Sequence, residues 1–457
     1  MGALRICINT QTPLLQFSAP TDGTHPAWRI ENDLSKLEAG VDYRFSPGGV
    51  TRMVYPLAQR LIANGVWKDV HWVSLNPNAP ATVRLPGITL HNVAIGRERM
   101  GGYGNVKETI WTTVHGIDGP RLAQDLFWTE DYGEYTYYNR TTAELIGELD
   151  RQFDFDLFYI HDFQQLPIGH MLGTLKPKVF RWHIPFDAKR IPEQWRSLFT
   201  TYLKAYDVVI VSTDAYKSAL QKFGHKGRIV RLYPFVDPSE FREPSVEDVE
   251  RTAEAKAIAP EDVMALVVAR MDPAKGQDKA IQALAQLAPR YPNLKLVLAG
   301  NGSFSGSSGG LGLSKSGRWR ALLEATAVEL GVRDRVVLTG HVTQEELDGL
   351  YARSAFTILP STFEGFGLVV VESWLHRRPA LVTDRAGIAE LIRDGENGLL
   401  FDPDDPSSLA RQMRRVLSMR GDLVRRLTTA GFATARECSL DAAARAEARL
   451  IGRAVEA

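Results

Sequence analysis

The chain has few cysteines, no excess of charge of either sign and no long apolar run. Cys7 and Cys438, its only cysteines, are far apart, which argues against a disulfide framework or a cysteine metal site. Lys and Arg together number 54, as do Asp and Glu, so the basic excess of nucleic-acid-binding proteins is missing. No apolar run approaches the roughly 20 residues that span a bilayer. Residues 1–9 lack the features of a signal peptide, so we expect a cytoplasmic enzyme.

The chain is too long for one typical hydrophobic core, so two domains are expected from its 457 residues. In the second half, short β-branched runs alternate with helical segments, and the first half repeats the pattern less regularly. Such alternation predicts α/β domains with parallel sheets covered by helices. We place two Rossmann-like domains at residues 1–235 and 260–435, joined by the Pro- and acid-rich residues 232–261. The expected strands are residues 5–8, 70–74, 157–160, 179–182, 208–212, 266–269, 295–299, 336–339, 356–359 and 380–383.

The segment EGFGLVVVE, which runs from Glu364 to Glu372, is the most informative in the chain. It follows an expected strand and predicts a helix that begins near Gly367. Amide groups at a helix N-terminus favour an anion. Two carboxylates around an anion site suit a ligand with phosphates in the middle and hydroxyl groups at both ends, such as a nucleotide-diphosphate sugar. One carboxylate alone would be better explained as a cap or a solvated helix residue.

This segment resembles the E-x7-E signature of retaining glycosyltransferases with the GT-B fold, in particular family 4. Further segments resemble the family in the same order, between about residues 264 and 401; they are residues 267–276, 296–303, 336–342, 387–392 and 397–400. At Arg385–Gly387 the chain departs from the family's glycine pair. The resemblance implies the GT-B fold: two Rossmann-like domains facing across a cleft, an acceptor-binding first domain, a donor-binding second domain, and a terminal helix, residues 440–457, that packs back onto the first.

The same resemblance implies how the second domain holds its donor. Arg270 and Lys275 would grip the diphosphate, Glu372 the ribose hydroxyls and Glu364 the transferred sugar. Further expected donor contacts are Gly302, Gly365, Phe366, Gly367 and Leu368. Because two cations and a helix N-terminus already face the diphosphate, we expect no metal and no other cofactor. Asp154 and Asp156 have the D-x-D spacing of metal-dependent enzymes, but they precede a strand, which favours a turn and strand-start role.

Polar residues follow two expected strands of the first domain. His161 and Asp162 end one strand and His183 follows another, at the sheet edge where ligands of open α/β sheets bind. Gly49 precedes an expected helix and is a possible donor contact, although glycine pairs are equally common in plain loops.

These strand ends resemble the matching segments of trehalose-phosphate synthases and of trehalose glycosyltransferring synthases. Tyr103 and Trp111 resemble the acceptor loop of the same enzymes more loosely, and a role as core aromatics is weighed equally. In the phosphate synthases an Arg that holds the acceptor phosphate stands where this chain has Asn9-Thr-Gln11. A free sugar and a sugar phosphate therefore both stay open as acceptors.

The resemblance thus implies a retaining hexosyltransferase, expected to need no metal, that moves glucose from a nucleotide-diphosphate sugar, such as UDP-glucose, to a small sugar or sugar phosphate, as in trehalose biosynthesis. Arg270, Lys275 and the helix amides would stabilise the leaving group, His183 the developing positive charge, and Asp162 would orient the acceptor. Donor and acceptor are the expected partners, and a homodimer is left open. The alternatives are transfer to glycerol, glycerate or fructose phosphate, a nucleotide-sugar epimerase on the same fold, and a non-catalytic sugar-binding module.

Overall fold

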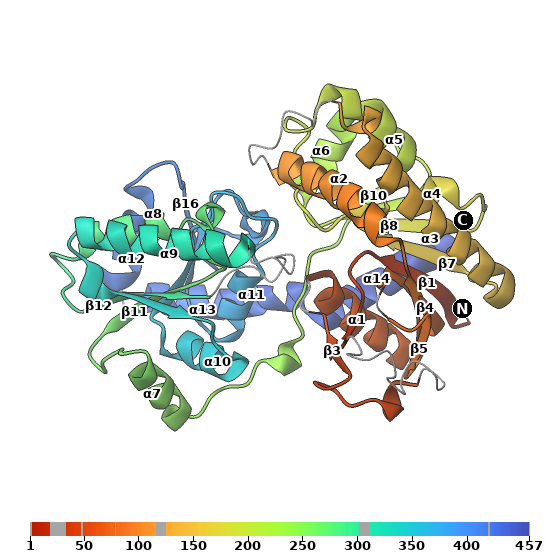
Figure 1. The fold of residues 1–457 in the computed structure, drawn as a ribbon. Helices are drawn as coiled ribbons and strands as arrows, with labels where there is room; N and C mark the ends of the chain where they lie inside the picture. Colours follow the sequence, from red (N-terminus) through yellow and green to blue (C-terminus); the bar gives the residue numbers. More distant parts are fainter. Residues whose placement is uncertain are drawn as a thin grey trace. The chain divides into compact units, whose positions relative to one another are not determined.

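The computed structural model describes residues 2–18, 33–46, 49–77, 79–115, 125–300, 311–418 and 421–456 (Figure 1). The chain forms two compact units. The first consists of Met1–Tyr233 and Ala443–Ala457, and the second of Pro234–Ala442. No helix in the described ranges is long and apolar enough to cross a membrane.

The first unit is built on a sheet with the strand order β10-β9-β8-β7-β1-β4-β6-β5, in which only the β5–β6 pair is antiparallel. Its central strand β7 is buried at every position, as a parallel strand covered on both faces requires. The strands are β1 Leu4–Thr10, β4 Trp67–Leu75, β5 Thr82–Leu85, β6 Ile88–Val93, β7 Leu157–His161, β8 Lys178–Arg181, β9 Val208–Val211 and β10 Ile229–Arg231, with a separate hairpin of β2 Leu15–Phe17 and β3 Tyr43–Phe45.

Seven α-helices are described in or reaching into this unit: α1 Gly49–Ala63, α2 Arg97–His115, α3 Glu130–Phe153, α4 Ile168–Met171, α5 Arg196–Leu203, α6 Asp214–Phe223 and α14 Leu440–Val455. Local chemistry sets several of their ends. Thr129 caps α3 by accepting from the Tyr132 amide, and Thr213 caps α6 in the same way from Tyr216. Gly224 ends α6 in the left-handed conformation.

The second unit has an all-parallel sheet with the strand order β13-β12-β11-β14-β15-β16. Residues of β11 alternate between two hydrophobic cores. Ala265 and Val267 belong to the core that contains residues of α8, and Met264 and Leu266 to the core that contains residues of α10. The strands are β11 Val263–Val268, β12 Leu294–Ala299, β13 Val336–Gly340, β14 Phe356–Leu359, β15 Ala380–Thr383 and β16 Leu399–Phe401.

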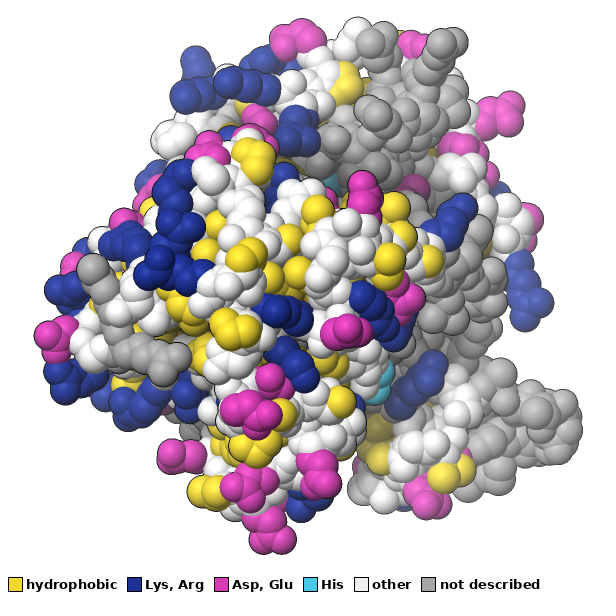
Figure 2. Space-filling model, turned by 90° about the vertical axis from the view of Figure 1, so that its left-hand side faces the viewer, with side chains coloured by type: hydrophobic (Ala, Val, Ile, Leu, Met, Phe, Trp, Pro, Cys, Tyr) yellow, Lys and Arg dark blue, Asp and Glu magenta, His cyan; other side chains and the backbone are white. Residues whose placement is uncertain are grey.

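The helices described in this unit are α7 Val246–Ala255, α8 Gln277–Leu287, α9 Leu311–Glu329, α10 Gln344–Arg353, α11 Leu368–Leu375, α12 Ser408–Ser418 and α13 Asp422–Ala435. Thr343 and Glu346 form the predicted capping box at the start of α10. Figure 2 shows basic and acidic side chains interspersed on this unit, in line with the equal numbers of the two in the chain.

The expected irregular connection over residues 232–261 differs from the structure. Ser245 caps α7 by accepting from the Asp248 amide, and Thr252 and Ala253 are buried. Thr252 lies against Gly349 of α10. The second unit therefore begins at Pro234, well before residue 260. Periodicity does not reveal α7 because the helix is short, half of its ten residues are charged, and only a narrow face of it is buried.

Candidate active site

Lys275 and Glu364 form an ion pair beyond the carboxyl ends of two central strands of the second sheet. The Lys275 Nζ donates to Glu364 Oε2 at 2.8 Å, and the two side chains are only 17% and 18% exposed. Glu364 Oε1 also accepts from the Gly365 amide at 3.1 Å. Lys275 ends the turn after β11 and Glu364 lies in the loop after β14, which is the neighbouring strand. The tertiary structure thus places two predicted donor residues in direct contact.

Gly367 sits between Glu364 and helix α11 in a conformation that requires glycine. Its φ is 103°, and a Cβ there would lie 2.7 Å from the Leu359 Cδ2. The N-cap residue of α11 is Gly367, which has no side chain that could cover the first amides of the helix. The Phe366 carbonyl accepts from the Ile388 amide at 2.8 Å, which fastens this loop to the segment after β15. The loop is therefore held with the helix N-terminus at the carboxyl edge of the sheet.

Glu372, the second carboxylate of the signature, is held by a tyrosine of another helix. The Tyr351 hydroxyl of α10 donates to Glu372 Oε2 at 2.8 Å. Burial, and then the Glu372 charge, raise the pKa of Tyr351 well above its usual value, so this hydroxyl remains a donor. Glu372 is thereby fixed on the first turns of α11, as its position in the sequence predicts.

Arg270 is exposed and follows β11 on the way to Lys275. Its carbonyl accepts from Gln277 Nε2 at 2.7 Å, and Gln277 Oε1 accepts from Trp319 Nε1 at 3.0 Å. At Gly276, with φ 64°, a Cβ would lie 2.1 Å from the Pro360 carbonyl oxygen, so the loops after β11 and β14 are in close contact. Arg270, Lys275 and Glu364 consequently come from two adjacent loops.

His161, Asp162 and His183 form a connected group at the carboxyl edge of the first sheet. His161 Nδ1 and His183 Nε2 share a hydrogen bond of 2.9 Å, and the two rings stack with centroids 5.3 Å apart. Asp162 has φ 69°, an uncommon conformation for a residue other than glycine. Its amide donates to the Arg181 carbonyl at 2.8 Å, and its Oδ1 accepts from the Phe163 amide at 3.0 Å.

Burial controls the protonation of this group. Burial raises the pKa of Asp162 to about 7, against the opposing effect of the Phe163 and His183 amides. Burial, then the Arg181 charge, lower the pKa of His183 to about 3. Burial also lowers the pKa of His161, helped by His183 and Arg181. Near neutral pH both imidazoles are therefore uncharged, and Asp162 is poised between its acid and its carboxylate.

Comparison with known proteins identifies the family. Residues 47–240 match Glycosyltransferase Family 4, and residues 248–433 match Glycosyl transferases group 1. A D-inositol 3-phosphate glycosyltransferase of Corynebacterium urealyticum is 30% identical over 381 residues, which cover 81% of this chain and 82% of that protein. The chain belongs to glycosyltransferase family 4.

Solved structures share the fold of this family 4 glycosyltransferase. A UDP-forming α,α-trehalose-phosphate synthase from Burkholderia xenovorans superposes with a TM-score of 0.72 at 17% identity, covering 99% of each chain. A sucrose-phosphate synthase from Thermosynechococcus elongatus gives 0.68 at 18% identity and covers 98% of each chain. At these identities the likeness concerns the fold alone. The predicted α/β fold of GT-B type, with two parallel-sheet domains, is confirmed.

The remaining predicted site residues of the glycosyltransferase are dispersed. Tyr103 is 1% exposed and packs edge-on against Tyr138, as a core aromatic does. Trp111 is partly buried and stacks on His115 with centroids 4.2 Å apart. Gly49 is the exposed first residue of α1, and no neighbouring atom lies within 4 Å of a Cβ placed there. Gly302 lies outside the described residues.

Asp154 and Asp156 of the glycosyltransferase have structural contacts. Asp154 ends α3 with φ 53° and pairs with Lys176 at 2.7 Å. Asp156 Oδ2 accepts from the Arg5 amide at 2.7 Å, near the start of strand β1. This agrees with the turn and strand-start interpretation. Within the described ranges, no group of three or more His, Cys, Asp or Glu could hold a metal ion.

Some residues that support the predicted groups were missed in the sequence. Tyr351 holds Glu372, and Arg181 lies in contact with Glu447 of α14. A charged residue at the end of the apolar strand β8 is a signal that a buried partner exists. Nothing local identifies that partner, because α14 carries several charged residues spaced along an alanine-rich helix.

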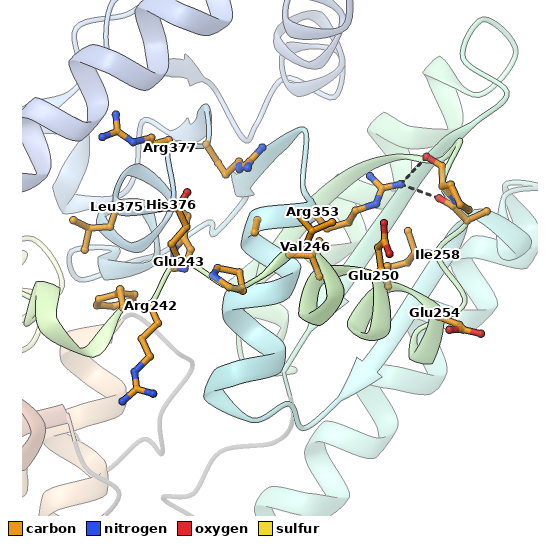
Figure 3. Close-up of a pocket in the computed structure, with 18 of the residues that line it drawn as sticks. Arg242, Glu243, Val246, Glu250, Glu254, Ile258, Arg353, Leu375, His376 and Arg377 are labelled. Atoms are coloured by element: carbon orange, nitrogen blue, oxygen red, sulfur yellow. Dashed lines mark hydrogen bonds between the residues drawn. The ribbon is translucent and has the colours of Figure 1, made fainter.

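A separate cavity of about 1330 Å³ lies in the second unit of the glycosyltransferase (Figure 3). Its walls come from α7, the end of α10 and the turn after α11. Arg353 in this wall donates to the carbonyls of Ala259, Pro260 and Asp262, just before β11 begins. The cavity therefore lies at the amino edge of the sheet, and none of the predicted donor residues that the structure describes lines it.

Proposed function

We propose that this family 4 glycosyltransferase moves glucose from a nucleotide-diphosphate sugar to a small sugar or sugar phosphate, with retention of configuration. The product would be a trehalose-type disaccharide. The group of His161, Asp162 and His183, in which the two rings share a hydrogen bond and the His183 amide donates to the Asp162 carboxyl, carries the acceptor part of the proposal. The Burkholderia xenovorans synthase with the same fold is a UDP-forming enzyme, which supports a UDP-sugar donor.

On the donor side, Arg270, Lys275 and the first amides of α11 would stabilise the charge that develops on the diphosphate. Glu364 would accept from hydroxyl groups of the transferred sugar, and Glu372 from those of the ribose. Their contacts support these roles, because Lys275 and Tyr351 hold the two carboxylates in fixed positions. The proposal requires no metal ion and no other cofactor.

On the acceptor side, Asp162 would bind acceptor hydroxyl groups. A carboxyl group with a pKa of about 7 can both donate and accept hydrogen bonds at neutral pH. The neutral His183 would lie beside it and support the positive charge of the sugar through a ring nitrogen or its carbonyl oxygen. A charged imidazolium there would oppose that charge, and the low pKa of His183 avoids it.

In the proposed transfer, the bond between the anomeric carbon and the diphosphate oxygen breaks. The bond from that carbon to an acceptor oxygen forms on the same face, and the acceptor proton moves to the departing phosphate oxygen. The alternative double displacement needs a carboxylate nucleophile close to the anomeric carbon. Asp162 is the candidate for that role, and an Asp162→Asn variant that still forms product would exclude it.

The test mixes the purified protein with UDP-, ADP- and GDP-glucose and with glucose, glucose 6-phosphate, fructose 6-phosphate and glycerate. We expect nucleotide diphosphate release that depends on acceptor, and an α-linked product whose anomeric configuration is read from its proton coupling constants. An altered sugar nucleotide formed without acceptor would instead indicate an epimerase. Donor binding without any turnover would indicate a sugar-binding module.

A second candidate acceptor is an inositol phosphate. The relative with 30% identity over most of both chains is named a D-inositol 3-phosphate glycosyltransferase. Inositol 3-phosphate is therefore added to the acceptor panel, and the ratio of kcat/KM values between it and glucose 6-phosphate decides between the two.

A further inference from the structure

Three side chains that are far apart in sequence meet beneath the acceptor group of the first unit. The Tyr159 hydroxyl donates to Glu447 Oε1, and Arg181 Nη1 donates to Glu447 Oε2 at 3.1 Å. Arg181 Nη1 also lies 3.3 Å from the Tyr159 hydroxyl. Tyr159 is in β7, Arg181 ends β8, and Glu447 belongs to the C-terminal helix α14.

This triad is buried without access to water. Tyr159 and Glu447 are 0% exposed and Arg181 is 4% exposed. Burying an ion pair removes two charges from water, and apolar residues of similar volume often stabilise a fold equally well. Stability alone therefore does not require charged side chains at this position.

The triad touches the acceptor group on two sides. The Tyr159 ring lies 4.2 Å from the His161 ring, centroid to centroid. Arg181 pairs in register with His161 across β7 and β8, and its carbonyl accepts from the Asp162 amide. His183 follows Arg181 by two residues. The Arg181 charge also contributes to keeping both imidazoles neutral.

We infer that Glu447 is a positioning residue for the acceptor group: through Tyr159 and Arg181, the C-terminal helix fixes the strand ends that carry His161, Asp162 and His183. This inference rests on the proposed function and adds to it a residue that contacts no substrate. Glu447 holds the Arg181 guanidinium in one place, so the Arg181 charge acts on the two histidines at a fixed distance. The Arg181 carbonyl is likewise kept in position to accept from the Asp162 amide.

The decisive variant is Glu447→Gln, which keeps the shape and a hydrogen-bond acceptor but removes the charge that anchors Arg181. The matched control is Arg449→Gln, an exposed position on the same helix. We expect kcat/KM for the acceptor to fall at least tenfold in Glu447→Gln, while the Kd for nucleotide diphosphate stays within twofold of wild type. Arg449→Gln should leave both quantities unchanged.

A second variant separates positioning from stability. In the triple variant Tyr159→Phe, Arg181→Met, Glu447→Leu, apolar groups replace the whole triad. We expect it to fold with a melting temperature close to that of wild type and still to show the tenfold loss toward the acceptor. If the triple variant regains full acceptor kcat/KM, or if Glu447→Gln weakens nucleotide binding as much as acceptor use, the inference is wrong.

A readout without turnover keeps this test independent of the proposed function. In protein labelled with ¹³C-histidine, the His161 and His183 signals should move in Glu447→Gln and stay in place in Arg449→Gln. Unmoved signals would overturn the inference. Moved signals in a protein that transfers no sugar to any acceptor would instead contradict the proposed function and leave the positioning of the histidines supported.

Discussion

Lys275 and Glu364 are 89 positions apart in sequence, yet the Lys275 Nζ donates to Glu364 Oε2 at 2.8 Å. The pair joins a cation expected at the donor diphosphate to a carboxylate expected at the transferred sugar. In a glycosyl donor these two parts adjoin at the bond that breaks. The ion pair therefore marks where we expect the anomeric carbon to lie against the second unit.

Replacing Lys275 or Arg270 with Ala should lower kcat/KM by about two powers of ten or more, because each cation stabilises charge that grows in the transition state. Arg290→Ala, an exposed cation beyond the other end of α8, serves as the control. Steady-state kinetics with a circular dichroism check of folding measure the effect. Near-normal turnover in a folded Lys275→Ala protein would refute the assignment.

Gly367→Ala should destabilise the second unit and weaken donor binding. A left-handed residue with a Cβ costs about 1–2 kcal/mol, and the contact with Leu359 adds about 1–3 kcal/mol of overpacking. Gly331→Ala is the matched control, since Gly331 has φ 69° with open space around it. Urea unfolding should show a larger loss of unfolding free energy in Gly367→Ala than in Gly331→Ala. Equal losses would mean that the close contact with Leu359 relaxes without cost.

Activity should survive an excess of EDTA, because Arg270, Lys275 and the N-terminus of α11 would already neutralise the diphosphate. Initial rates are compared before and after chelation, with added Mg²⁺ as the control. Complete loss that Mg²⁺ restores would require a metal site in the reaction.

Asp162→Asn should impair use of the acceptor far more than binding of the donor. A site built on hydrogen bonds to hydroxyl groups discriminates strongly when one partner changes. We expect acceptor kcat/KM to fall at least tenfold and the Kd for nucleotide diphosphate to change less than twofold. Equal effects on both ligands would remove Asp162 from the acceptor site.

Acid should destabilise the first unit through a buried histidine pair. His71 Nδ1 and His91 Nε2 lie 2.8 Å apart, and burial, then His71, lower the pKa of His91 to about 4. Since the pKa of histidine in the unfolded chain is near 6.5, the contribution of the uncharged His91 to the free energy of unfolding is fully present above pH 6.5. It is lost as pH falls toward 4, by about 3 kcal/mol. Unfolding free energies of wild type and His91→Gln should converge over that range, and parallel curves would contradict the assignment.

Much of the fold could be predicted from local patterns. The apolar runs of β7 and β14 and the capping box of Thr343 and Glu346 lie where the sequence places them, whereas β11 begins at Val263, before the expected residue 266. The sequence predicts a connection over residues 246–255 because a short, charged helix buries too few residues to show a clear period. The buried position of Tyr103 could not be predicted either, because an aromatic residue looks the same in a sequence whether it packs in the core or faces a ligand.

The sequence by itself determined what depends on neighbours along the chain: ten of the described strands, the turn at Gly367 before a helix, and the strand ends that carry Asp162 and His183. Only the tertiary structure decided which distant side chains meet. The partners of Glu364, Glu372 and Arg181 are Lys275, Tyr351 and Glu447, each on another element. The physical reason is that strand order and helix packing, which bring these groups within hydrogen-bonding distance, arise from burial of the whole core, whereas periodicity reports only which face of one element is buried.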